Sequence, residues 1–240
     1  MAPPSDRGAG KPVSVKASPD RLYGRQRTHA LRPRQRLLLA KTLPRFRLDA
    51  QVYPADAFAD TVRQIWLEIG FGGGEHARAF AAANPAIGLI AAEVFEQGLC
   101  SMLAAFVREG EEETAHPPPN LRLWDDDARG LIASLPEASL DGAILMFPDP
   151  WPKARHAKRR FVHPDTARLL ASRLKPGSEW RIASDDPTYQ LWVSDVLAPE
   201  AAFRLEGFWR ERPAHWPPTR YEEKALKARR QPLYWVWRRV

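Results

Sequence analysis

The sequence predicts an α/β fold with a doubly wound, mostly parallel seven-stranded sheet that finishes in a C-terminal antiparallel hairpin. From residue 63 onward, short apolar runs alternate with amphipathic stretches, which is typical of parallel strands covered by helices on both faces. Two aromatic-rich runs then follow at 203–209 and 233–237. Too little predicted helix separates them for a parallel crossover, so we expect them to pair antiparallel at the sheet edge.

Each element is predicted by its own run of residues. The apolar runs predict strands at 65–69, 87–94, 121–124, 143–147 and 180–183. The stretches between these runs predict helices near 75–83, 96–109, 163–174 and 187–197.

Composition limits the class of protein. A chain of 240 residues buries one sizeable core, so one main domain is expected. Cys100 is the single cysteine, which excludes an internal disulfide and favours a reducing compartment. No apolar run is long enough to span a bilayer, and residues 1–6 lack the hydrophobic core of a secretory signal. We therefore expect a cytoplasmic protein with no membrane segment, no metal and no obligate protein partner.

Residues 1–48 are expected to form a basic, partly disordered arm ahead of a folded domain at 49–240. The arm carries twelve of the 36 Lys and Arg residues but two of the 29 acids. Residues 1–20 lack hydrophobic periodicity, whereas Leu31 and the run 37–39 fit a short amphipathic helix lying on the domain. Such charge attracts a polyanion or simply solvates the arm, and charge alone slightly favours the second interpretation.

A glycine-rich segment follows the first predicted strand. Gly70-Phe71-Gly72-Gly73-Gly74 precedes a helix, an arrangement that lets backbone approach a ligand closely. The segment departs from the dinucleotide pattern G-x-G-x-x-G, because Glu75 stands at the third glycine position. An ordinary glycine-rich turn is the alternative.

Carboxylates at the same sheet edge favour a ligand. Glu68 lies in the first predicted strand, Glu93 near the end of the second, and three aspartates, 125–127, follow the third. Glu93 is placed to accept hydrogen bonds from both ribose hydroxyls of a nucleoside. Glu68 would repel a pyrophosphate but attract the ammonium of a methionine moiety, which favours S-adenosylmethionine over a nicotinamide dinucleotide. One of the three aspartates would accept from the adenine amine.

The fourth predicted strand runs into a stiff loop and a basic run. Prolines flank Asp149 on both sides, and Trp151 and a further proline follow. Stiffness suits methyl transfer, which depends on holding two reactants in line. Five cations lie between residues 153 and 160; if each met a phosphate, RNA affinity would fall roughly 500-fold between about 50 and 200 mM salt. A solvated loop is the alternative.

Here the chain resembles the bacterial tRNA (guanine-N7)-methyltransferases, which have a Rossmann-like class I methyltransferase fold and modify the variable-loop guanine at position 46. The resemblance runs from about residue 22 to the C-terminus. Its most specific part is Pro148-Asp149-Pro150-Trp151-Pro152-Lys153 with Arg155, His156 and 158–160. The segments that also match are 67–72, Glu93, 127–128, 184–185, 219–222 and 224–225.

The resemblance implies a role for each matching residue. Asp149 is implied to be catalytic and, with Glu68, Gly70, Gly72, Glu93 and Asp127, to contact S-adenosylmethionine. The implied tRNA contacts are Lys153, Arg155, His156, Lys158, Arg159, Arg160, Asp185, Thr219, Arg220, Tyr221 and Glu222. Helix capping is the alternative for Asp185 and Thr219.

The chemistry of N7 limits what Asp149 must do. N7 carries a lone pair and no proton to lose, so a strong general base is unnecessary. We expect Asp149 to orient the guanine and to offset the positive charge left on the methylated base. Trp151 and Tyr221 are expected to stack on a flipped base, whereas Trp66, Trp180, Trp235 and Trp237 are expected in the core.

Two rival functions remain open. An amino-group methyltransferase is the first, because Asp149-Pro150-Trp151 resembles a D-P-P-[YW] loop with proline and tryptophan transposed. A noncatalytic RNA-binding or assembly factor is the second. A P-loop NTPase and a zinc deaminase are excluded, since the sequence has neither G-x-x-x-x-G-K-[ST] nor H-x-E followed by C-x-x-C.

Overall fold

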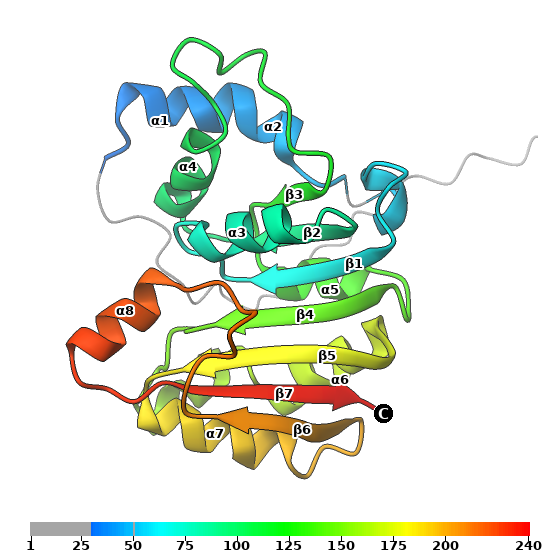
Figure 1. Cartoon of the computed structure of the whole chain (residues 1–240), viewed down its shortest axis with the longest axis vertical. Coiled ribbons are helices and arrows are strands. Elements are labelled where there is room, and N and C mark those ends of the chain that lie inside the picture. The colour runs from blue at the N-terminus through cyan, green and yellow to red at the C-terminus, as the bar shows by residue number, and fades with distance from the viewer. Residues whose placement is uncertain (1–29, 50) are drawn as a thin grey trace, which may run out of the picture.

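A computed structural model describes residues 30–49 and 51–240 (Figure 1). The disorder expected for residues 1–20 lies outside these ranges. Seven strands form one sheet: β1 (Gln64–Ile69), β2 (Ile87–Ala92), β3 (Leu121–Trp124), β4 (Leu140–Met146), β5 (Leu174–Ser184), β6 (Phe203–Trp209) and β7 (Leu233–Arg239). The α-helices are α1 (Pro33–Leu37), α2 (Leu43–Phe46), α3 (Glu75–Ala83), α4 (Glu96–Ala104), α5 (Ala128–Ser134), α6 (Pro164–Arg173), α7 (Pro187–Leu197) and α8 (Arg220–Lys227). A π-helix, η1 (Leu38–Thr42), and two 3-10 helices, η2 (Pro54–Ala57) and η3 (Ala154–Arg159), complete the elements.

The sheet has the order β3-β2-β1-β4-β5-β7-β6. The first five strands are parallel, and β7 pairs antiparallel with both β5 and β6. This confirms the predicted doubly wound sheet with an antiparallel C-terminal end. Instead of a tight hairpin, the β6–β7 connection contains α8, which the sequence analysis missed because only Glu222 and Ala225 of its eight residues are buried.

Helices cover both faces of the sheet, and each face has its own core (Figure 1). Residues of α5, α6 and α7 pack with Leu67, Leu145 and Trp180 on one face. Residues of η1, α2, α3 and α4 pack with Leu89 and Ile144 on the other. Burial on both faces explains why the central strands read as continuous apolar runs rather than alternating ones. The four tryptophans expected in the core are all buried.

The segment before β1 is fastened to the body by a helix, as its leucines predicted. Leu38, Leu43 and Phe46 are buried in the second core. The Thr42 hydroxyl donates to the Glu112 carbonyl at 2.7 Å, and the Leu48 amide donates to the Leu123 carbonyl at 2.8 Å. Three arginines of this segment, Arg34, Arg45 and Arg47, bond to residues between 107 and 125.

The strand register brings the residues that follow β1, β2 and β4 together at one edge of the sheet. Ile69, the last residue of β1, lies opposite Ala92 in β2 and Leu145 in β4. These three strands therefore end at the same level, and the residues that follow them meet there. Short 3-10 and α elements, η3 and α8, flank this edge.

Candidate active site

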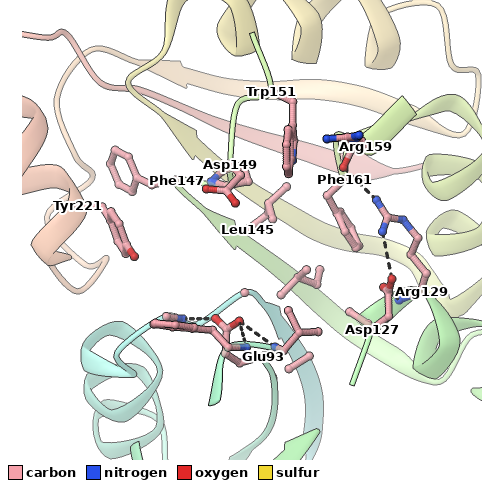
Figure 2. Close-up of a pocket in the computed structure, with 18 of the residues that line it drawn as sticks. Glu93, Asp127, Arg129, Leu145, Phe147, Asp149, Trp151, Arg159, Phe161 and Tyr221 are labelled. Carbon is pink, nitrogen blue, oxygen red and sulfur yellow. Dashed lines mark hydrogen bonds and ion pairs between the residues drawn. The ribbon is translucent and has the colours of Figure 1, made fainter. Parts of the chain in front are cut away.

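A cavity of about 430 Å³ opens at the carboxyl edge of the parallel strands (Figure 2). Segments that follow β1, β2, β3 and β4 line it, and α8 closes one side. Asp127 lies at one end, Tyr221 at the opposite end, and Glu93 between them (Figure 2). Asp149 faces Glu93 across the space. This is the edge at which open α/β sheets bind ligands.

The glycine loop after β1 needs its glycines for conformation and for space. Gly70, Gly72 and Gly74 have φ angles of +71°, +60° and +83°, which disfavour any residue with a Cβ. Gly70 lines the cavity, and a Cβ added there would meet no protein atom within 4 Å. A Cβ on Gly98, in α4, would lie 2.2 Å from the Gly72 carbonyl oxygen. Helix α4 therefore packs directly against a loop that leaves room for a ligand.

Glu93 is held in place by backbone donors. Its Oε2 accepts from the Gly72 amide at 2.7 Å, and its Oε1 accepts from the Val94 and Phe95 amides at 2.8 and 2.9 Å. Burial raises the pKa of Glu93, the backbone donors oppose that shift, and the charge of Asp149 adds to it. A carboxylate offers about four acceptor positions. Three are occupied by backbone donors, which leaves about one acceptor position of Glu93 open toward the cavity, and the contact with the ribose hydroxyls stays a prediction.

Asp127 caps α5 and lines the cavity at the same time. Its Oδ1 accepts from the Arg129 amide at 2.9 Å, and its Oδ2 accepts from the Arg129 guanidinium at 3.2 Å. Asp126 also lines the cavity, whereas Asp125 pairs with Arg47. The sequence analysis missed Arg129. The helix-capping spacing of Asp127 was the available signal for α5 and this partner.

The loop after β4 presents Asp149 to the cavity in an exposed position. Two non-glycine residues near it, Phe147 and Trp151, have φ angles of +51° and +43°. Such a conformation costs about 1–3 kcal/mol per residue and persists only where the surroundings enforce it. Arg160 does so from beneath: it is 4% exposed and donates to the Pro150 and Trp151 carbonyls, each at 3.1 Å. The structure thus buries Arg160 against the loop that it supports.

The remaining basic residues of the run divide into two groups. Lys153, Arg155 and Lys158 are exposed and lie outside the cavity lining. Arg159 lies 4.8 Å from the Trp151 ring, and His156 packs edge-on against the same ring at 5.7 Å. Desolvation and the positive charges of Arg159, Arg155 and Lys153 lower the pKa of His156 below its ordinary value.

Residues 219–222 form the start of α8, and the structure gives them different positions: two support the helix and two line the cavity. Thr219 caps the helix, accepting from the Glu222 amide at 2.9 Å, which agrees with the capping alternative. Glu222 is buried and accepts from Arg212 at 2.9 Å and from the Tyr234 hydroxyl at 2.8 Å. Arg220 and Tyr221 line the cavity.

Glu68 and Asp185 also lie outside the cavity lining. Glu68 is 1% exposed and its Oε2 lies 3.0 Å from Nδ1 of His76. Asp185 accepts from Arg230 at 2.6 Å. The following helix is capped by Asp186, which accepts from the Tyr189 amide, so helix capping is not the role of Asp185.

The cavity suits S-adenosylmethionine. Four acids line it, namely Glu93, Asp126, Asp127 and Asp149. Four basic residues, Arg129, Arg159, Arg220 and Lys224, also line it, so the lining is mixed in charge and offers both acceptors and cations to an adenosine that carries an amino acid. Gly70 leaves space at the loop, and Glu93 keeps one acceptor for the ribose. Within residues 30–49 and 51–240 there is no cluster of three or more metal-binding side chains and no helix able to cross a membrane.

Solved structures share this architecture. A 16S rRNA methyltransferase, KamB, aligns with a TM-score of 0.55 at 16% identity over 76% of this chain and 94% of that chain. A variant of the 16S rRNA (adenine(1408)-N(1))-methyltransferase of Catenulisporales acidiphilia, solved with its cosubstrate SAM, aligns with a TM-score of 0.53 at 18% identity over 80% and 92%. Fold and site together define a doubly wound S-adenosylmethionine-dependent methyltransferase.

Sequence relatives specify the family. Residues 62–234 match the model of the family described as "Putative methyltransferase". The tRNA (guanine-N(7)-)-methyltransferase of Granulibacter bethesdensis is 61% identical over 93% of this chain and 96% of its own length. That of Paramagnetospirillum magneticum is 42% identical over 91% and 92%. The chain belongs to the tRNA (guanine-N7)-methyltransferase family.

Proposed function

We propose that this enzyme transfers a methyl group from S-adenosylmethionine to N7 of the variable-loop guanine of tRNA, at position 46, and that it works in the cytoplasm. The names of the relatives support the substrate. The observation that carries the proposal is the position of Asp149. It stands exposed in the cavity, across from Glu93, on a loop that runs directly into the basic segment η3.

The residues divide the work between donor and base. When bound, S-adenosylmethionine supplies an electrophilic methyl group on a sulfonium. Glu93 and Asp127 bind its ribose and adenine through the acceptor positions that their backbone partners leave open. Asp149 accepts hydrogen bonds from the amide and amine edge of guanine, which turns N7 toward the donor. Its negative charge also offsets the positive charge that the product base gains.

The basic segment holds the RNA beside the cavity. Lys153, Arg155 and Lys158 contact phosphates, because they are the exposed cations of the run. Tyr221 is 40% exposed at the cavity mouth and stacks on the flipped base, a contact worth about 1–3 kcal/mol. Glu68 is buried beside His76 and Asp185 is paired with Arg230, so neither is given a direct contact with the donor or the base.

Transfer of labelled methyl groups to unmodified tRNA, followed by nucleoside identification, tests the proposal. We expect 7-methylguanosine, and no labelled product from the same tRNA with adenine at the target position. N6-methyladenosine would instead identify an amino-group methyltransferase. No binding of the donor in calorimetry would identify a noncatalytic RNA-binding factor.

A further inference from the structure

The α8 end of the cavity contains a cation whose function is not explained by the fold. Arg220 lines the cavity, and its Nε is buried without a hydrogen-bond partner. Within the described residues, Arg220 contacts Glu75, whose Oε1 lies 3.8 Å from Nε, and the Tyr221 ring, which lies 5.2 Å from the guanidinium carbon. The Arg220 side chain as a whole is 40% exposed, so the burial concerns Nε alone; a buried donor without an acceptor is costly, and a ligand in the cavity would supply that acceptor.

Arg220 lies over the glycine loop, at the end of the cavity opposite Asp127. A Cβ added to Gly72 would lie 3.2 Å from the ring of Tyr221, the residue next to Arg220. Glu75 begins α3 directly after that loop, so its ion pair keeps the guanidinium close to the loop. Figure 2 shows Tyr221 and Asp127 on opposite sides of Glu93.

The donor needs a cation at this end. With adenine at Asp127 and ribose at Glu93, the amino-acid part of the donor extends toward the glycine loop and α8. That part carries an α-carboxylate, and an arginine fork matches a carboxylate in a bidentate manner. We propose that Arg220 binds the α-carboxylate of the S-adenosylmethionine methionyl group; this assignment rests on the donor-binding mode described above.

Other cations of the cavity are less suited to this task. Arg129 is paired with Asp127 at the adenine end. Arg159 packs against Trp151 on the Asp149 loop. Lys224 also lines the cavity, but its side chain is exposed and its Nζ lies over the Tyr221 ring at 5.5 Å. Arg220 is thus assigned to the donor, whereas the family resemblance implied an RNA contact.

A comparison of two ligands in calorimetry tests this. S-adenosylhomocysteine carries the α-carboxylate, whereas 5′-deoxy-5′-methylthioadenosine lacks the whole amino-acid part. We expect Arg220→Ala to weaken S-adenosylhomocysteine by roughly 10- to 100-fold, the range for a lost charge-assisted hydrogen bond, and methylthioadenosine by less than about twofold. Arg220→Lys should recover part of the loss. Lys227→Ala is the matched control, because it removes a positive charge from the same helix on an 81% exposed side chain outside the cavity.

The outcomes separate this proposal from the proposed function. Equal weakening of both ligands by Arg220→Ala would overturn the assignment, because it would mean that the variant disturbs the cavity as a whole. Unchanged S-adenosylhomocysteine binding with a raised KM for tRNA would also overturn it and return Arg220 to the RNA. Failure of the wild-type enzyme to bind either ligand would overturn the proposed function, because it would mean that S-adenosylmethionine is not the donor.

Discussion

The loops after β2 and β4 each present a carboxylate to the same cavity, but they hold it differently. Glu93 is fixed by three backbone amides and is buried. Asp149 is exposed and has no hydrogen bond with another described residue, while the loop around it is fixed by Arg160 and by unusual φ angles. The proposed donor site is thus held in shape by backbone, and Asp149, the acid that we propose orients the base, keeps its acceptor positions free. A carboxylate orients a substrate well when the backbone around it is already fixed and its acceptor positions are still free for the substrate.

Replacing Asp149 should produce the largest effect. We expect Asp149→Ala to lower kcat by about 10²- to 10³-fold, the cost of losing one electrostatic partner of the reacting group, while affinity for tRNA stays largely unchanged. Asp149→Asn keeps the shape and removes the charge, so its kcat should be intermediate. Single-turnover methylation measures both variants. A normal kcat for Asp149→Ala would refute the role that we propose for Asp149, and with it the functional contrast between the two loops.

Arg160 and Arg155 sharpen the comparison within one basic run. Arg160→Ala removes two charged hydrogen bonds that hold the Asp149 loop, so unfolding in urea should require about 2–3 kcal/mol less free energy. Arg155→Ala alters an exposed side chain and should change stability by less than about 0.5 kcal/mol. Similar losses of stability in the two variants would contradict the claim that buried Arg160 holds the Asp149 loop in place.

The smallest expected effect concerns salt. Three exposed cations, Lys153, Arg155 and Lys158, contribute a slope of about −2.7 to the dependence of log tRNA affinity on log salt, which is roughly 40-fold between 50 and 200 mM. This fall in affinity is smaller than the roughly 500-fold that would apply if all five cations of residues 153–160 contacted phosphates. Each alanine variant of the three should reduce the slope by about 0.9, measured by filter binding. A slope that stays at the wild-type value would remove that residue from the RNA contacts.

The sequence predicted the strands, the sheet edge and the family because each depends on local pattern. Continuous apolar runs predicted β1 to β5, and the row of acids after them predicted the donor class. The sequence could not distinguish Arg160 from Arg155, because burial depends on a fold that brings Pro150, Trp151 and Trp192 around one guanidinium. Nor could it identify Arg129 or the separate tasks within 219–222, since these depend on two short helices, α5 and α8, that have few buried apolar residues.

The attachment of residues 31–48 has a practical consequence for shortened versions of the protein. The family match begins at residue 62. A fragment cut there would uncover the apolar surface on which Leu38, Leu43 and Phe46 rest, and would free the outer edge of β3 that Leu48 now pairs with. Open strand edges and bare apolar patches promote aggregation. Expression fragments should therefore start before residue 31.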